Sequence, residues 1–184
     1  MDAFLTSTFT VALAEIGDKT QLLSLFLAAR FQNKRAIIFG ILVATLINHA
    51  ASAWLGAWIA QYLQSMVGQW LIGLSFIALG LWLLKPDKEE TPDSYIAGYG
   101  AFIVSTVLFF LAEIGDKTQV ATVLLGAQFD SVLLVTLGTT LGMLAANAPV
   151  VYAGKHLTTR VPMKAIHLLA AMIFILLGIL KIAM

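Results

Sequence analysis

Cysteine is absent from the 184 residues of this chain, and charged residues are scarce. The absence of cysteine excludes disulfide bonds, thiolate metal sites and cysteine nucleophiles. Charged residues make up 11% of the chain, whereas soluble domains carry about 25%, and 60% of the residues are hydrophobic. The net charge is +1 and no run of basic residues occurs, so we expect no nucleic-acid partner. This composition is typical of a membrane protein and excludes an ordinary soluble domain.

Long hydrophilic segments are also rare, and the apolar runs between them predict six membrane-spanning helices. A bilayer-spanning helix needs about 20 apolar residues. Apolar runs that meet this need lie at 4–29, 36–62, 70–84, 101–127, 132–154 and 165–182. The one sizeable hydrophilic stretch, 85–93, contains two prolines and six charged residues. The sequence therefore predicts an all-α polytopic membrane protein, with three helices in 1–84, a cytoplasmic linker at 85–100 and three helices in 101–184.

The two halves of the chain carry the same motif. Residues 13–21, LAEIGDKTQ, recur without change as residues 111–119, an offset of 98 positions. The same offset pairs Gly40 with Gly138, Gly56 with Gly154 and Gly80 with Gly178. Such self-similarity predicts a duplicated three-helix unit. Because three crossings reverse the direction of the chain, the second unit enters the membrane from the opposite side, and the two units form an inverted repeat.

The distribution of basic residues predicts how this repeat is oriented. With the six helices at the predicted positions, only Lys181 lies on one side of the membrane, whereas eight basic residues lie on the other: Arg30, Lys34, Arg35, Lys85, Lys88, Lys155, Arg160 and Lys164. Cytoplasmic loops of membrane proteins are enriched in lysine and arginine. We therefore expect the basic side to be cytoplasmic and both termini to lie outside. His156 and His167 lie at or near a predicted cytoplasmic loop.

Six ionisable residues lie near the middle of the first and fourth predicted helices, namely Glu15, Asp18, Lys19, Glu113, Asp116 and Lys117. An aspartate or lysine at the centre of a membrane helix costs on the order of 3 kcal/mol, so these residues must face one another, water or a bound ion. Four carboxylates and two lysines leave a formal charge of −2. Either one divalent cation or two protons cancels that charge, which predicts that metal and protons exchange at the site.

A purely structural reading of the same residues is less consistent with their charges. In that reading each lysine neutralises the glutamate four residues earlier, and the ion pairs only hold the helices together. A stabilising network has no reason to keep two excess negative charges inside a membrane. The charge excess therefore favours a cation site, with Lys19 and Lys117 balancing part of the charge.

Other polar residues on the predicted helices are candidates for supporting the site. Gln21 and Gln119 lie on the polar face of a continuous helix at about 100° per residue. Two further groups occur at helical spacing on the second and fifth helices: Thr45, Asn48, His49 and Ser52, then Thr136, Thr139, Thr140 and Asn147. The amides of Asn48 and Asn147 are the better candidate ligands, because an amide oxygen is a hard donor that is costly to leave in lipid. His49 is more readily explained as a packing residue than as a ligand.

Glycines lie at positions that predict special backbone geometry. Gly17 and Gly115 separate the acidic residues of each motif, which predicts either close helix approach or local unwinding there. Gly138 and Gly142 form a GxxxG pair on the fifth predicted helix. This spacing is a signal for close contact between helices.

The Glu-x-Gly-Asp-Lys-Thr signature in two three-helix halves resembles that of the Gdt-type cation transporter family. This family includes MneA-like bacterial manganese exporters and Golgi manganese/calcium transporters, and the resemblance covers essentially the whole chain. It implies secondary transport of Mn2+ or Ca2+ out of the cytoplasm in exchange for protons, with a metal site formed by Glu15, Asp18, Glu113 and Asp116. The eukaryotic N-terminal extension is missing, so the resemblance implies a bacterial member in the inner membrane.

The residues themselves lead to an intramembrane cation site with oxygen ligands, and leave several functions open. Carboxylate and amide oxygens without cysteine favour Mg2+, Ca2+ or Mn2+ over copper or zinc, as transported substrate rather than permanent cofactor. A Ca2+/H+ antiporter is therefore the main alternative to a manganese exporter. A channel is disfavoured, because an inverted repeat around a midplane site is typical of alternating access. The oligomeric state is not indicated.

Two functions of other classes are also compatible with a membrane protein of this composition. An intramembrane aspartyl protease would use two acids as a general acid/base pair. The lysine that follows each aspartate argues against it, because a neighbouring cation keeps a carboxylate ionised when such a pair must share a proton. A structural membrane subunit has no use for the excess charge. The motif thus favours a transporter over an enzyme.

Overall fold

The computed structural model describes residues 1–85, 99–129, 131–154 and 163–183, and every regular element in these ranges is a helix. The helices are α1 (Asp2–Glu15), α2 (Lys19–Arg30), α3 (Lys34–Ala60), α4 (Met66–Leu83), α5 (Ala101–Glu113), α6 (Lys117–Gln128), α7 (Val132–Ala153) and α9 (Met163–Ala183). Of these, α3, α4, α7 and α9 are long and apolar enough to cross a membrane. The predicted all-α class is confirmed, while most of the predicted linker lies outside the described residues.

The first and fourth predicted helices are each broken in two, so the prediction of continuous helices over 4–29 and 101–127 is wrong. The breaks fall between α1 and α2 and between α5 and α6. Each break contains a glycine with positive φ, 87° at Gly17 and 75° at Gly115. Glycine adopts this conformation without the steric cost that other residues meet, and it ends an α-helix. Of the two alternatives predicted for these glycines, the structure shows local unwinding.

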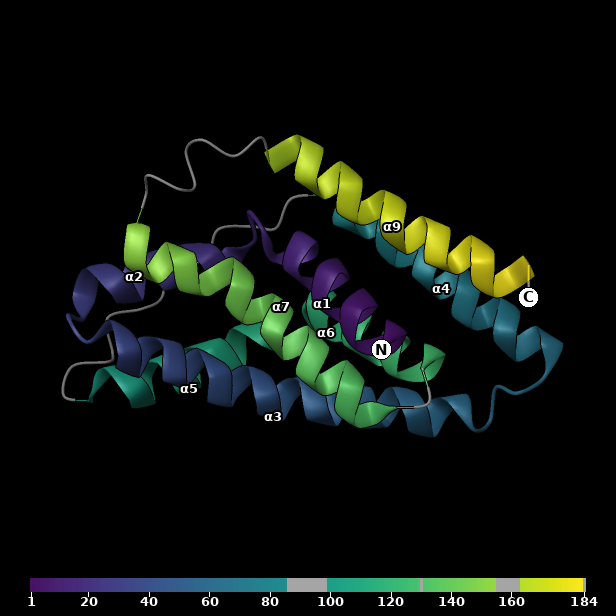
Figure 1. Cartoon of the computed structure of the whole chain (residues 1–184), viewed down its shortest axis with the longest axis horizontal. Helices are drawn as coiled ribbons and strands as arrows, with labels where there is room; N and C mark the ends of the chain where they lie inside the picture. The colour runs from purple at the N-terminus through teal and green to yellow at the C-terminus, as the bar shows by residue number, and fades with distance from the viewer. Residues whose placement is uncertain (86–98, 130, 155–162, 184) are drawn as a thin grey trace.

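The helices pack as a central group with a separate pair at one side (Figure 1). In the central group, α7 packs on α1, whereas α3 packs on α5, α6 and α7. The pair consists of α4 and α9, which run antiparallel along each other and contact the central group through α1 and α6. The two broken helices therefore pack against α3 and α7, the long helices of the central group, while apolar side chains of α1 and α5 such as Phe9 and Val107 remain exposed.

Small residues let the helices of the central group approach closely. A Cβ atom on Gly138 would lie 2.6 Å from the carbonyl oxygen of Phe4, and one on Gly142 would lie 2.6 Å from that of Thr8. Both distances are far below van der Waals contact, so no side chain fits at either position. The close helix contact predicted from the GxxxG spacing is confirmed, and it places α7 directly against the first broken helix.

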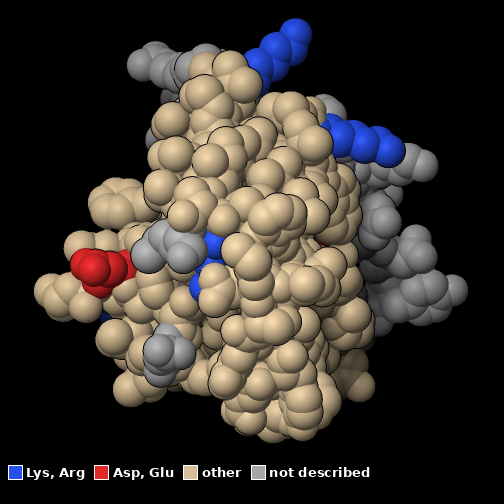
Figure 2. Space-filling view, turned by 90° about the vertical axis from the view of Figure 1, so that its right-hand side faces the viewer, with Lys and Arg blue, Asp and Glu red and all other residues tan. Residues whose placement is uncertain are grey.

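Charged side chains are unevenly distributed over the surface. Figure 2 views the end of the molecule where α3 is followed by α4 and where α9 ends, and mostly uncharged side chains cover this end. Arg30, Lys34 and Arg35 lie instead where α2 ends and α3 begins, at the opposite end in Figure 1. Large apolar side chains such as Phe9, Trp54 and Leu176 are exposed along the helices. An exposed apolar surface of this extent is typical of contact with lipid.

Candidate metal centre

Carboxylates from both breaks come together inside the protein. Glu15 is the last residue of α1, Glu113 is the last residue of α5, and Asp116 directly precedes α6. One carboxylate oxygen from each of the three lies within 4.8 Å of the other two. Glu15 and Glu113 are fully buried, and Asp116 is 4% exposed. Residues about 100 positions apart in the sequence thus form one acidic group, called the carboxylate group below.

The two breaks are held by the same interaction in each half. Gln21 Oε1 accepts a hydrogen bond from the backbone N–H of Gly17 at 3.0 Å, and Gln119 Oε1 accepts one from that of Gly115 at 2.7 Å. Unwinding removes the helical partner of these N–H groups, and a backbone donor without a partner is costly in an apolar environment such as a bilayer. The two glutamines, predicted as support for the site, therefore bind the unwound backbone that positions the carboxylates.

Threonine hydroxyls satisfy only part of the carboxylate group. Thr20 Oγ1 donates to Glu15 Oε2 at 2.5 Å, and Thr118 Oγ1 lies 3.1 Å from Asp116 Oδ2. No residue that the structure describes donates a hydrogen bond to the buried Oε1 atoms of Glu15 and Glu113. Buried carboxylate oxygens without donors are rare, because their desolvation is not compensated. A hard divalent cation would supply the missing interaction.

Sequence reasoning assigns no role to these two threonines. The signal that could have identified them is present, because both belong to the repeated motif and occupy the same place in each copy. A threonine two residues after the aspartate can reach the carboxylates only when the helix is broken. On a continuous helix its hydroxyl would point away from them.

The lysines of the motifs have partners outside their own helices. Lys19 Nζ lies 3.2 Å from Asp116 Oδ1, so an ion pair joins the first motif to the second. Lys117 is 6% exposed and donates to the backbone carbonyl of Lys85 at the end of α4. Lys19, considered above as the partner of Glu15 one turn earlier, thus contacts an acid of the other half.

Asp18 is not part of the carboxylate group, because among the described residues the set of oxygens within 4.8 Å of one another does not include it. It is the N-cap of α2 and lines a small void with Lys117 and His167. His167 on α9 places Nε2 3.1 Å from the carbonyl oxygen of Ile16, inside the first break. This histidine, expected near a cytoplasmic loop, thus contacts the site region. The role of Asp18 as a fourth metal ligand stays a prediction.

All the polar residues singled out on the second and fifth predicted helices are buried. Asn48 Nδ2 donates to the carbonyl of Phe110 at 3.1 Å, one turn before the second break begins. Asn147 Oδ1 accepts from Ser24 Oγ at 2.9 Å. Both asparagines therefore bind protein atoms next to the breaks, and their predicted role as metal ligands stays a prediction. His49 lies closer to the acids, with Nε2 3.6 Å from Glu113 Oε2.

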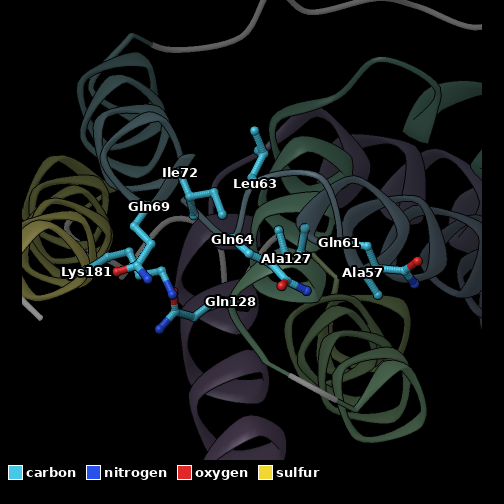
Figure 3. Close-up of a pocket in the computed structure, with 10 residues that line it drawn as sticks. Ala57, Gln61, Leu63, Gln64, Gln69, Ile72, Ala127, Gln128 and Lys181 are labelled. Carbon is cyan, nitrogen blue, oxygen red and sulfur yellow. The ribbon is translucent and has the colours of Figure 1, made fainter. Parts of the chain in front are cut away.

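Two pockets lie toward opposite ends of the molecule, and neither is lined by the carboxylate group. One, of about 310 Å³, is lined by four glutamines and Lys181, together with apolar residues of α3, α4 and α6. Figure 3 shows Gln69, Gln128 and Lys181 on one side of this pocket and Gln61 on the other. The second, of about 370 Å³, lies where α2 and α7 end and α3 begins. The carboxylate group, by contrast, is buried.

Comparison with known proteins shows the family of this chain. The sequence profile described as "Divalent cation/proton antiporter GDT1" matches residues 3–91 and 101–183. The chain belongs to the GDT1 family. This family consists of transporters rather than enzymes. The intramembrane protease considered above is therefore excluded. The resemblance carried by the repeated acidic motif is therefore confirmed, and the chain is a multi-pass membrane protein of this family.

Individual relatives agree with this assignment. A protein of Vibrio cholerae serotype O1 named "Putative manganese exporter" is 48% identical over 180 residues, which cover 97% of this chain and 90% of that protein. "GDT1-like protein sll0615" of Synechocystis is 26% identical, covering 97% and 96% of the two chains. "GDT1-like protein 4" of Oryza sativa subsp. indica is also 26% identical, covering 95% of this chain and 70% of the rice protein. No solved structure matches the chain.

Proposed function

We propose that this GDT1 protein exports Mn2+ from the cytoplasm of a bacterium in exchange for protons, through one metal site shared by both halves of the chain. The observation that carries the proposal is the carboxylate group itself. Three buried acids from two separate breaks meet within 4.8 Å, and two of their oxygens have no donor among the described residues. The name of the Vibrio relative supports manganese as the cargo.

The broken helices support a topology of six crossings. The helices α1, α2, α5 and α6 contain 14, 12, 13 and 12 residues, so each is shorter than the roughly 20 residues that a crossing requires. Taken in pairs, α1 with α2 and α5 with α6, they are long enough for one interrupted crossing each. Transporters place such interrupted helices at the membrane midplane, where unwound backbone is tolerated because it faces a binding site.

Contacts that repeat at the 98-residue offset support the inverted repeat. A Cβ atom on Gly73 would lie 2.8 Å from the carbonyl oxygen of Gly178, and one on Gly80 would lie 2.8 Å from that of Ala171. The offset converts Gly73 into Ala171 and Gly80 into Gly178, so the two contacts exchange places. In the same way the packing of α3 on α5 corresponds to the packing of α7 on α1. Such pairs of contacts are expected when two copies are related by a pseudo-two-fold axis.

The charge of the site explains why metal and protons would exchange. The four motif carboxylates and two lysines carry a formal charge of −2, and a bound divalent ion makes the site neutral. An empty site must acquire two protons before it can turn toward the other side of the membrane, since uncompensated charge is costly in the bilayer. The buried carboxylate group corresponds to the occluded stage of this cycle, and we propose the pockets at the two ends as its entry and exit.

Transport into proteoliposomes that contain a pH-sensitive dye tests this proposal. An imposed pH gradient should drive Mn2+ flux with an opposite flow of protons. Glu15→Gln and Glu113→Gln should each abolish the flux, because one shared site cannot be replaced by the other half. Asp2→Asn, which changes an exposed acid at the start of α1, serves as the control and should transport at the parental rate.

Three outcomes would contradict separate parts of the proposal. Parental transport by a variant altered in one half would exclude a single shared site. Metal flux without a proton signal, at a rate indifferent to the gradient, would exclude proton exchange. Parallel measurements with Ca2+ test the alternative of a Ca2+/H+ antiporter, because oxygen ligands also suit Ca2+. A gradient-driven flux of Ca2+ without a flux of Mn2+ would exclude the manganese assignment.

A further inference from the structure

His49 on α3 is buried beside the carboxylate group, and its ring nitrogens lack hydrogen-bond partners among the described residues. Its side chain is fully buried, and Nε2 lies 3.6 Å from Glu113 Oε2. Within the described part of the chain, neither Nδ1 nor Nε2 has a hydrogen-bond partner. A buried polar atom normally has a partner, because leaving it without one costs more than a lost hydrogen bond. The packing role expected from the sequence does not account for this placement.

The corresponding position of the other half behaves differently. The 98-residue offset pairs His49 with Asn147, whose amide binds the Ser24 hydroxyl and the Met143 carbonyl. Asn147 is therefore satisfied by protein atoms, whereas His49 is not. The duplicated acids are the same in both halves, but a nitrogen donor occurs on one side only. This asymmetry indicates that the imidazole contributes something that the repeated motif does not supply.

We propose that His49 is a further ligand of the transported cation, binding through Nε2 together with Glu113, and that it determines a preference for Mn2+ over Ca2+. The proposal rests on the function proposed above, in which the carboxylate group holds the metal. Its geometry is compatible with joint coordination. Two ligands of one ion at a metal–ligand distance of about 2.2 Å lie between about 3.1 and 4.4 Å apart. The 3.6 Å between Nε2 and Oε2 falls inside this interval.

The chemistry of the donor atoms connects this ligand to selectivity. Ca2+ takes oxygen ligands, and carboxylate and carbonyl oxygens suit Mn2+ as well, so carboxylates alone give little basis for choosing between the two ions. An imidazole nitrogen is a softer donor that binds first-row transition ions in preference to calcium. One such nitrogen beside the Glu113 carboxylate would therefore raise the affinity for Mn2+ while adding nothing for Ca2+. His49 would be the residue that distinguishes the two ions at an otherwise unselective site.

Electron paramagnetic resonance of Mn2+ bound to the purified protein tests the ligand directly. Spin-echo modulation should show coupling to an imidazole ¹⁴N nucleus in the parent chain and lose it in His49→Gln. His156→Gln is the matched control and should keep the coupling, whereas loss of the coupling in His167→Gln but not in His49→Gln would assign it to the histidine at the first break and overturn the proposal. Bound Mn2+ without any ¹⁴N coupling would overturn the ligand role of His49 and leave the carboxylate site standing. Failure of the protein to bind Mn2+ at all would contradict both proposals.

Transport selectivity provides the second measurement. In proteoliposomes, His49→Gln should raise the KM for Mn2+ by roughly tenfold or more, with little change for Ca2+, since loss of even the residues that only support metal ligands costs about 10–100-fold in affinity or activity. Equal losses for both ions would show a structural role and overturn the proposal. His49→Asn, which copies the residue at the matching position of the other half, provides a second variant if the glutamine variant does not fold, and the same loss of selectivity is expected of it.

Discussion

The ion pair between Lys19 and Asp116 offers the sharpest test of the charge argument. The two atoms lie 3.2 Å apart and join the first motif to the second. Lys19→Gln alone changes the formal charge of the site from −2 to −3, and Asp116→Asn alone changes it to −1. With Mn2+ bound, the two variants carry −1 and +1, respectively. The double variant keeps −2 when empty and is neutral with metal, like the parent.

The expected sizes follow from the cost of one uncompensated charge. That cost is about 3 kcal/mol at the membrane centre. At about 1.4 kcal/mol for each factor of ten in rate, it corresponds to roughly 100-fold slower transport. Lys19→Gln should therefore lose roughly 100-fold. Asp116→Asn should lose more, since it also removes a carboxylate of the proposed site. The double variant should recover most of the 100-fold loss in transport rate that the uncompensated charge causes, and it should retain a loss of about tenfold for the missing carboxylate.

Initial rates of Mn2+ flux in proteoliposomes under a fixed pH gradient measure all four members of this cycle. The charge argument requires the double variant to be faster than Asp116→Asn alone. If the two losses instead add, so that the double variant is slower than either single variant, charge balance at the site is refuted. The acids would then act through geometry alone. Mutations of residues in direct contact are expected to have non-additive effects. The difference between the loss in the double variant and the sum of the two single losses therefore tests charge balance.

Two further predictions concern the break and the topology. Gly115→Ala should lower both the thermal midpoint of unfolding and the transport rate, because an L-residue at φ 75° costs on the order of 1–3 kcal/mol. Gly100→Ala is the control and should change neither. Like Gly115, Gly100 has free space for a Cβ atom, but its φ is an ordinary −71°. Equal midpoints for the two variants would show that the positive φ is not strained for alanine. Single cysteines in this cysteine-free chain should label from outside at Gln64 and not at Asn33 or Glu90, and external labelling at Glu90 would contradict the inverted orientation.

The sequence by itself determined the class of the protein and the identity of its chemical groups. Hydropathy and charge are properties of composition, and they survive any arrangement of the helices. The repeated motif is similarly independent of tertiary structure, so the family and the acidic residues Glu15, Glu113 and Asp116 could be identified in advance. A close helix contact at Gly138 and Gly142 was also predictable, because the spacing is local to one helix, whereas the identity of its partner, α1, was not.

The tertiary structure decided which of these groups meet. A helical wheel assumes a continuous helix, and a single glycine at φ 87° or 75° invalidates it for every residue that follows. For this reason the sequence could not show that Lys19 pairs with Asp116 rather than with Glu15, or that Thr20 reaches a carboxylate. The placement of His49 beside Glu113 depends on α3 packing against the second broken helix, 64 residues further along the chain. No pattern within one helix encodes such a contact, because it is set by the side chains of both helices together.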